Sequence, residues 1–93
     1  MIYLLVTYRA EDEETLENFY TELLEKKIGE KSRAEEGNIK YDYFLSLEKD
    51  NELLLTEIWK DEEALAVHGE TEHLKQAKEL GLKYRLDVDV IRI

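Results

Sequence analysis

The 93-residue chain has no cysteine, no proline and only four glycines. Without cysteine, neither a disulfide nor a thiolate metal site can stabilise the fold, and the redox compartment is not indicated. The scarcity of proline and glycine argues against a disordered linker, so we expect one domain over residues 1–93. A domain of this size buries about 60–65% of the surface that its unfolded chain exposes, so a single core is marginal.

Basic residues and long apolar runs are also scarce. Thirteen lysines and arginines stand against 23 acidic residues, which gives a net charge of −10. Such a surface repels phosphate backbones and anionic lipids, so we expect no nucleic acid partner and no membrane partner. No run reaches the roughly 18 apolar residues that span a bilayer. The apolar residues 1–8 lack a basic leader and a cleavage site, so they predict a strand, and a cytoplasmic location follows by default.

Apolar periodicity in the first half of the chain predicts a strand, a helix and a hairpin. Residues 2–7 form a strand that is apolar on both faces. An acidic cluster at 11–14 begins a helix, and Gly29 is its expected stop. Residues 30–37 are predicted as a loop. Strands at 39–47 and 52–59, joined by a turn, complete this half.

The second half predicts a broken helix and a last strand. Asp61 is a helix N-cap, and Gly69 ends that short helix. Thr71 caps a second helix, which Gly81 closes, and residues 84–93 form a strand. The resulting order is that of a ferredoxin-like α+β fold, with a four-stranded antiparallel sheet and helices on one face. The apolar second face of the sheet needs a partner, so we expect a homodimer through this open face.

The only tryptophan and both histidines lie close together in the sequence. Trp59 ends an apolar strand, and His68 and His73 follow within fifteen residues on a predicted helical segment. An aromatic residue at a strand end that faces histidines on the next helix can form a small pocket. Such a pocket would contain a group that titrates near neutral pH.

Three motifs between residues 30 and 75 carry a family resemblance. Residues 32–41 read S-R-A-E-E-G-N-I-K-Y, residues 57–65 read E-I-W-K-D-E-E-A-L, and residues 68–73 read H-G-E-T-E-H. They resemble (T/S)-R-x-E-x-G-x-x-x-Y, E-x-W-x-(D/S)-x-E-A-L and H-x-x-(S/T)-x-H of the antibiotic biosynthesis monooxygenase (ABM) family. The resemblance implies a dimeric α+β barrel with a pocket between sheet and helices in each protomer. Relatives include monooxygenases that oxidise quinols or polyketide phenols without metal or flavin.

We therefore expect a cofactor-independent monooxygenase of a small aromatic or quinol-like substrate, with no cofactor and no metal. An electron-rich phenolate can give one electron to dioxygen, so the protein must bind the aromatic, help to deprotonate it and exclude water. His68 is the candidate catalytic base or hydrogen-bond partner, because an imidazole has an unperturbed pKa of about 6.5. The alternative is a helix-terminal histidine that interacts with backbone carbonyls.

The candidate substrate-binding residues are Trp59, Glu57, Arg33, Tyr41 and His73. Trp59 either stacks on a substrate ring or packs in the core. Glu57 shares its strand face, and Arg33 is the expected partner for this carboxylate. Tyr41 faces either the cavity or the dimer interface.

Other functions stay open. One is an isomerase that shifts a proton beside a carbonyl of a sugar-like substrate, with His68 as base. Another is a non-catalytic dimeric binding module that kept the pocket. Haem breakdown ranks third, because Thr7 stands where haem-degrading relatives carry an asparagine. Metal chelation by both histidines with Glu70 or Glu72 is not favoured, because the intervening glycine need not keep them on one face.

Overall fold

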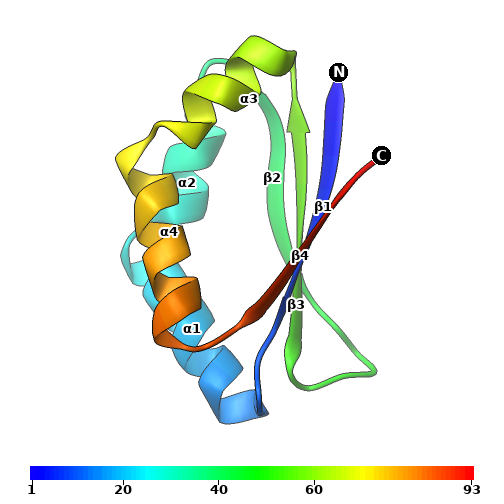
Figure 1. Cartoon of the computed structure of the whole chain (residues 1–93), viewed down its shortest axis with the longest axis vertical. Coiled ribbons are helices and arrows are strands. Elements are labelled where there is room, and N and C mark those ends of the chain that lie inside the picture. The colour runs from blue at the N-terminus through cyan, green and yellow to red at the C-terminus, as the bar shows by residue number, and fades with distance from the viewer.

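The computed structural model describes all 93 residues, with two helices after the first strand and two after the third (Figure 1). In chain order the elements are β1 (Ile2–Arg9), α1 (Glu13–Glu25), α2 (Ile28–Arg33), β2 (Asn38–Leu45), β3 (Glu52–Trp59), α3 (Glu62–Gly69), α4 (Glu72–Lys83) and β4 (Asp87–Arg92). The strands form one antiparallel sheet in the order β2-β3-β1-β4, and the helices cover one side of it (Figure 1). The predicted ferredoxin-like α+β fold is confirmed. No helix combines the length and the apolar character that crossing a membrane requires.

The core lies between the sheet and the helices. Val6 and Tyr8 of β1 are buried and pair across the ladder with Leu55 and Leu53 of β3, which are also buried. From α1, the fully buried Phe19 covers this layer, and its ring centroid lies 5.0 Å from that of Tyr8. Side chains alternate between the two sides of a strand. Every second residue of β3, up to its last position, therefore points toward the helices.

The other side of the sheet carries apolar side chains that no helix covers. Tyr3 is 40% exposed, Phe44 is 47% exposed and Ile91 is 51% exposed. Leu5 lies beside Ile91 in the ladder, and Leu54 lies beside Phe44. The prediction that the sheet is apolar on both sides is confirmed by these positions.

Gly69 is the last residue of α3, as predicted, whereas the helix ends predicted at Gly29 and Gly81 are wrong. Gly29 lies inside α2, which occupies part of the predicted loop at 30–37. The chain breaks instead at Lys27, whose φ of 56° interrupts the helical path. Gly81 lies inside α4, which continues to Lys83, and Arg85 provides the turn with a φ of 54°. Both glycines are buried. A Cβ atom at Gly29 would lie 2.9 Å from the ring of Tyr43, so the small size of this glycine serves packing.

The predicted N-caps of the two later helices are confirmed. The Asp61 side chain accepts a hydrogen bond from the backbone N–H of Ala64, and the Thr71 side chain accepts one from that of Leu74. These bonds satisfy backbone donors that an α-helix leaves unpaired in its first turn. They fix where α3 and α4 begin, and so where the two histidines lie. The last strand is shorter than predicted, since residues 84–86 form the exit from α4.

Candidate active site

A mostly apolar cavity of about 500 Å³ lies between the sheet and helices α3 and α4. Ten of its fourteen lining residues are hydrophobic, Tyr8 among them, and its charged or titratable lining residues include Glu57, His68 and Lys78. Pockets for small ligands have volumes of about 300–1,000 Å³ and a few placed polar groups, so this cavity has the size and lining of a small-molecule pocket.

A second hollow of about 550 Å³ lies between α1 and the loop that joins β2 to β3. Charged side chains such as Glu13, Glu48 and Lys49 line it, and it contains neither histidine nor tryptophan. It offers a solvated, charged surface and no buried titratable group. The apolar cavity beside α3 and α4 is therefore the candidate site.

His68 lies in the last turn of α3 and is only 2% exposed. Its ring lies against that of Trp59, with centroids 4.4 Å apart, and the Tyr41 ring meets it edge-on at 5.7 Å. The hydroxyl of Thr71 donates a hydrogen bond of 2.8 Å to the His68 carbonyl oxygen. Packing against Trp59 and Tyr41 thus holds the imidazole, and the start of α4 holds the backbone of His68.

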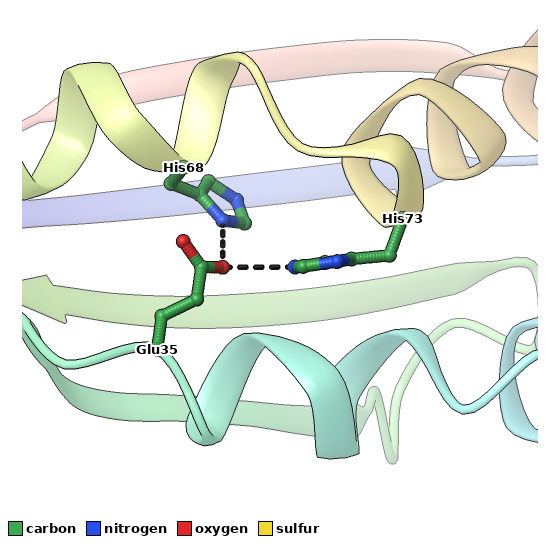
Figure 2. Close-up of side chains that lie close together, drawn as sticks. All are labelled: Glu35, His68 and His73. Atoms are coloured by element: carbon green, nitrogen blue, oxygen red, sulfur yellow. Dashed lines mark hydrogen bonds and ion pairs between the residues drawn. The ribbon is translucent and has the colours of Figure 1, made fainter.

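Glu35 joins the two histidines, which the sequence pattern did not predict. Its Oε2 atom lies 2.6 Å from Nδ1 of His68 and 2.9 Å from Nε2 of His73 (Figure 2). The three side chains come from the segment after α2, the end of α3 and the first turn of α4. Glu35 occupies the glutamate position of the S-R-x-E-x-G motif, and this was the signal that could have found it.

The hydrogen bonds to Glu35 determine which nitrogen of His68 is free. An ionised carboxylate only accepts hydrogen bonds, so each ring nitrogen bonded to Glu35 carries a proton. A neutral His68 therefore has its lone pair on Nε2, and this atom is buried without a hydrogen-bond partner. His68 also lines the cavity. Buried polar atoms without partners are rare, so this nitrogen stands out among the polar groups around the cavity.

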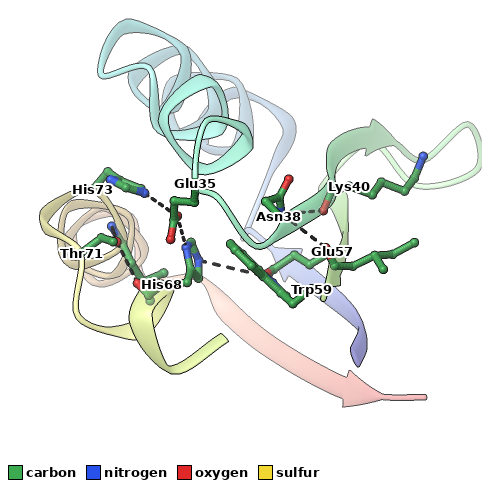
Figure 3. A network of polar contacts seen from close by, with 10 residues as sticks. Glu35, Asn38, Lys40, Glu57, Trp59, His68, Thr71 and His73 are labelled. Atoms are coloured by element: carbon green, nitrogen blue, oxygen red, sulfur yellow. Dashed lines mark hydrogen bonds and ion pairs between the residues drawn. The ribbon is translucent and has the colours of Figure 1, made fainter. Parts of the chain in front are cut away.

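Glu57 and Trp59 form the other side of the His68 environment (Figure 3). Oε1 of Glu57 accepts a 2.9 Å hydrogen bond from Nε1 of Trp59 and lies 3.9 Å from Nε2 of His68, which is too far for a hydrogen bond. Burial raises the pKa of the Glu57 carboxyl, while the Trp59 N–H and His68 act in the opposite direction. The net effect of this site on Glu57 is to favour its neutral form.

The predicted pairing of Arg33 with Glu57 is wrong. Nη1 of Arg33 donates a 2.6 Å hydrogen bond to the backbone oxygen of Tyr41, and Glu57 bonds to Trp59 instead. The reason is the helix α2, which runs through Arg33 and directs the guanidinium at β2. Arg33 therefore braces α2 against the sheet and does not reach the cavity.

The two aromatic candidates, Trp59 and Tyr41, pack against the His68 ring inside the core. Trp59 has no exposed surface and Tyr41 only 1%, and neither lines the cavity. Tyr41 thus points into the helix-covered core and away from the open face of the sheet. Burial raises the pKa values of Tyr41 and Tyr8, so both phenols stay neutral at physiological pH. Direct substrate contact by Trp59 or Tyr41 stays a prediction.

The donor atoms of Glu35, His68 and His73 lie within 4.8 Å of one another and are of types that bind transition metals. Neither Glu70 nor Glu72 joins them, so that part of the metal hypothesis is wrong. Neighbouring ligands of a tetrahedral ion with bonds of about 2.0–2.1 Å lie about 3.3 Å apart. The observed 2.6 Å and 2.9 Å separations are those of hydrogen bonds. The cluster is arranged as a hydrogen-bonded network.

The family model for antibiotic biosynthesis monooxygenase (ABM) matches residues 1–80 of this chain. The chain belongs to the ABM family. A candidate monooxygenase of Bacillus subtilis (strain 168), YcnE, is 40% identical to this ABM protein over an alignment of 79 residues, and the match covers 81% of this chain and 80% of YcnE.

Two solved structures resemble the fold. A conserved protein from Bacteroides thetaiotaomicron VPI-5482 has a TM-score of 0.88 and 27% identity, with 99% of this chain and 94% of that chain covered. SnoaB from Streptomyces nogalater, a cofactor-independent oxygenase, has a TM-score of 0.73 and 9% identity, with 99% and 89% covered. The second likeness concerns the fold alone. The family match confirms the resemblance to the ABM family that the three sequence motifs indicated.

Proposed function

We propose that this ABM protein is a cofactor-independent monooxygenase of a small phenol or quinol. The observation that carries the proposal is the buried, unpartnered Nε2 of His68, a residue that lines a mostly apolar cavity of about 500 Å³. A phenol has the matching shape and polarity, because its ring fits apolar walls and its hydroxyl can donate to Nε2. The family membership and the kinship with YcnE support the same assignment.

The chemistry requires little from the protein. The hydroxyl proton moves to Nε2 of His68, and the electron pair of the O–H bond stays on the phenolate oxygen. The phenolate then gives electrons to dioxygen, and one oxygen atom forms a bond to a ring carbon, whose C–H bond breaks. The other oxygen atom leaves as water with that hydrogen and the proton held by His68, and the phenol leaves oxidised to a quinone. The substrate supplies all the electrons. Apolar walls exclude bulk water from the radical pair, and the fixed imidazole contributes general-base catalysis.

An oxygen electrode and a panel of reduced quinones and phenols test this proposal. We expect dioxygen uptake with at least one compound, and a loss of about 100-fold or more in His68→Ala, in the range typical of a general base. Glu72→Gln is the matched control, because Glu72 is an exposed neighbour outside the Glu35 cluster. No uptake across the panel, with unchanged ligand binding in His68→Ala, would refute the assignment.

Two alternatives make different predictions for the same assay. An isomerase with His68 as base would turn over its substrate without dioxygen, so anaerobic product formation identifies it. Lys78 is the one cationic side chain that lines the cavity, which makes a phosphorylated substrate a poorer fit. A non-catalytic binding module would bind ligands in the cavity and convert none of them.

We also propose that the protein is a homodimer through the open face of the sheet. The exposed apolar residues on this face support it, since large uncovered apolar patches are rare on monomers. Sedimentation should give about twice the chain mass of 11.1 kDa. Ile91→Lys on this face should yield a monomer, whereas Leu24→Lys on exposed α1 should not. A wild-type monomer at micromolar concentration would refute the proposal.

A further inference from the structure

We propose that Glu35 and His73 are positioning residues, which hold His68 so that it accepts the proton of an ionisable hydroxyl. The cavity therefore selects weakly acidic phenols and binds them as phenolates. This inference rests on the proposed role of the cavity, and it adds the chemical class of the ligand and two residues that set it. Binding and spectroscopy test it, and neither requires turnover.

The hydrogen bond to Glu35 orients the His68 ring. Its Nδ1 lies 2.6 Å from Oε2 of Glu35, and this bond holds the proton on Nδ1. The opposite nitrogen, Nε2, must then present a lone pair, and it has no protein partner. A hydroxyl, which can donate, satisfies this atom, whereas an ether oxygen or a carbonyl cannot. The cavity therefore distinguishes a phenol from its methyl ether by one hydrogen bond.

Proton transfer then changes the charge of His68. When Nε2 takes the hydroxyl proton, the O–H bond breaks, an N–H bond forms, and His68 becomes a cation beside the Glu35 carboxylate. The side chain of Glu35 is 12% exposed and that of His68 is 3% exposed, so this ion pair is shielded from water. A carboxylate that orients an imidazole and stabilises its protonated form is the arrangement of hydrolase triads.

His73 anchors Glu35 in turn. Its Oε2 also lies 2.9 Å from Nε2 of His73, which has a side chain 13% exposed. No lysine or arginine pairs with Glu35, so the two imidazoles are the only groups that can balance its charge. The second oxygen, Oε1, is buried without a partner. Loss of His73 would leave this carboxylate with one bond and free to turn away from His68.

The other titratable groups around His68 do not replace Glu35 in this role. Glu57 on β3 is 3.9 Å from Nε2 and already accepts from Trp59. Burial raises the pKa of Tyr41 on β2 and of Tyr8 on β1, so neither is a base. Lys78 on α4 lines the cavity and carries the positive charge that a bound phenolate favours.

The experiment compares 4-nitrophenol, whose phenolate absorbs visible light, with 4-nitroanisole, its methyl ether. The wild-type protein should bind the phenol about tenfold or more tightly than the ether, equivalent to about 1.4 kcal/mol. It should also raise the phenolate absorbance at a pH where free 4-nitrophenol is mostly neutral. Glu35→Gln and His73→Leu should lose both effects. His73→Gln retains an N–H donor and should restore them in part. Glu36→Gln, an exposed neighbour, is the matched control.

Nitrogen NMR of the histidine rings provides the second readout, because a merely structural role of Glu35 would not change the tautomer. We expect protonated Nδ1 and unprotonated Nε2 for His68 in the wild type, and a mixture of tautomers in Glu35→Gln. The proposal is overturned by a protonated Nε2 in neutral wild-type His68, by equal affinities for phenol and ether, or by no binding of 4-nitrophenol. It is also overturned if purified protein holds a stoichiometric metal ion that the Glu35→Gln variant lacks. None of these outcomes depends on dioxygen uptake.

Discussion

Gly37 allows helix α3 to lie close to the segment that carries Glu35, and replacing it with alanine should disturb both stability and the site. A Cβ atom at position 37 would lie 2.1 Å from Cβ of Ala64 and 3.3 Å from its Cα. Gly37 has no positive φ, so the cost of alanine is steric and not conformational. The backbone oxygen of Gly37 also accepts a 2.9 Å hydrogen bond from the N–H of Lys60, which ties the two segments together.

The expected magnitude follows from this contact. Carbon atoms without a bond between them ordinarily approach to about 3.5–4.0 Å, so α3 and the Gly37 segment must separate by about 1.5 Å. Overpacking of this kind typically costs about 1–3 kcal/mol. Because α3 carries His68 and Glu35 lies two residues before Gly37, the same displacement should lengthen the His68–Glu35 hydrogen bond. We expect phenol binding to weaken along with stability.

Urea and thermal unfolding measure this effect, with Gly69→Ala as the matched control. A Cβ atom at Gly69 would meet nothing within 4 Å. Alanine at this helical position should be neutral or stabilising by up to about 1 kcal/mol. Each kcal/mol corresponds to about 4–8 °C in Tm for a domain of this size. Equal stability of Gly37→Ala and Gly69→Ala would refute the reasoning, as would a Gly37→Ala protein with unchanged His68 NMR signals.

Two further substitutions test the backbone and the buried charge. Lys27→Gly should stabilise the protein by up to about 1 kcal/mol in a urea titration, because φ is 56° at this position and glycine adopts this angle without strain. Lys26→Gly is the control: φ is −83° there, so this variant should not be more stable than the wild type. For Glu57, burial raises the folded-state pKa, so the folded protein binds more protons than the unfolded chain between the two pKa values. Stability should therefore fall as pH rises from the ordinary glutamate pKa of 4.5 toward the higher folded-state pKa, with a slope of at most about 1.4 kcal/mol per pH unit. Glu57→Gln keeps an oxygen for the Trp59 N–H and should remove this slope; an identical pH dependence of unfolding in wild type and variant would contradict it.

Local signals in the sequence predicted much of the fold. The β3 strand has the predicted bounds of 52–59, and the caps at Asp61 and Thr71 form as expected. These features depend on side chains within a few residues of one another, so their pattern is visible in the chain itself. The break at Lys27 was missed because the apolar helical spacing continues through Ile28. The chain turns at Lys27 so that α2 packs against β2. This contact is tertiary, so the local sequence pattern does not indicate it.

By itself, the sequence determined the order of the four strands and of the helical segments between them, the two-sided apolar sheet and the motifs of the ABM family, because periodicity and short motifs are local properties. Only the tertiary structure decided that Glu35 meets His68 and His73, which lie 33 and 38 residues away along the chain. It also decided that Arg33 turns from Glu57 to the backbone of β2. Hydrogen bonds between distant segments depend on how helices pack, and a packed helix selects one rotamer and one partner for each polar side chain.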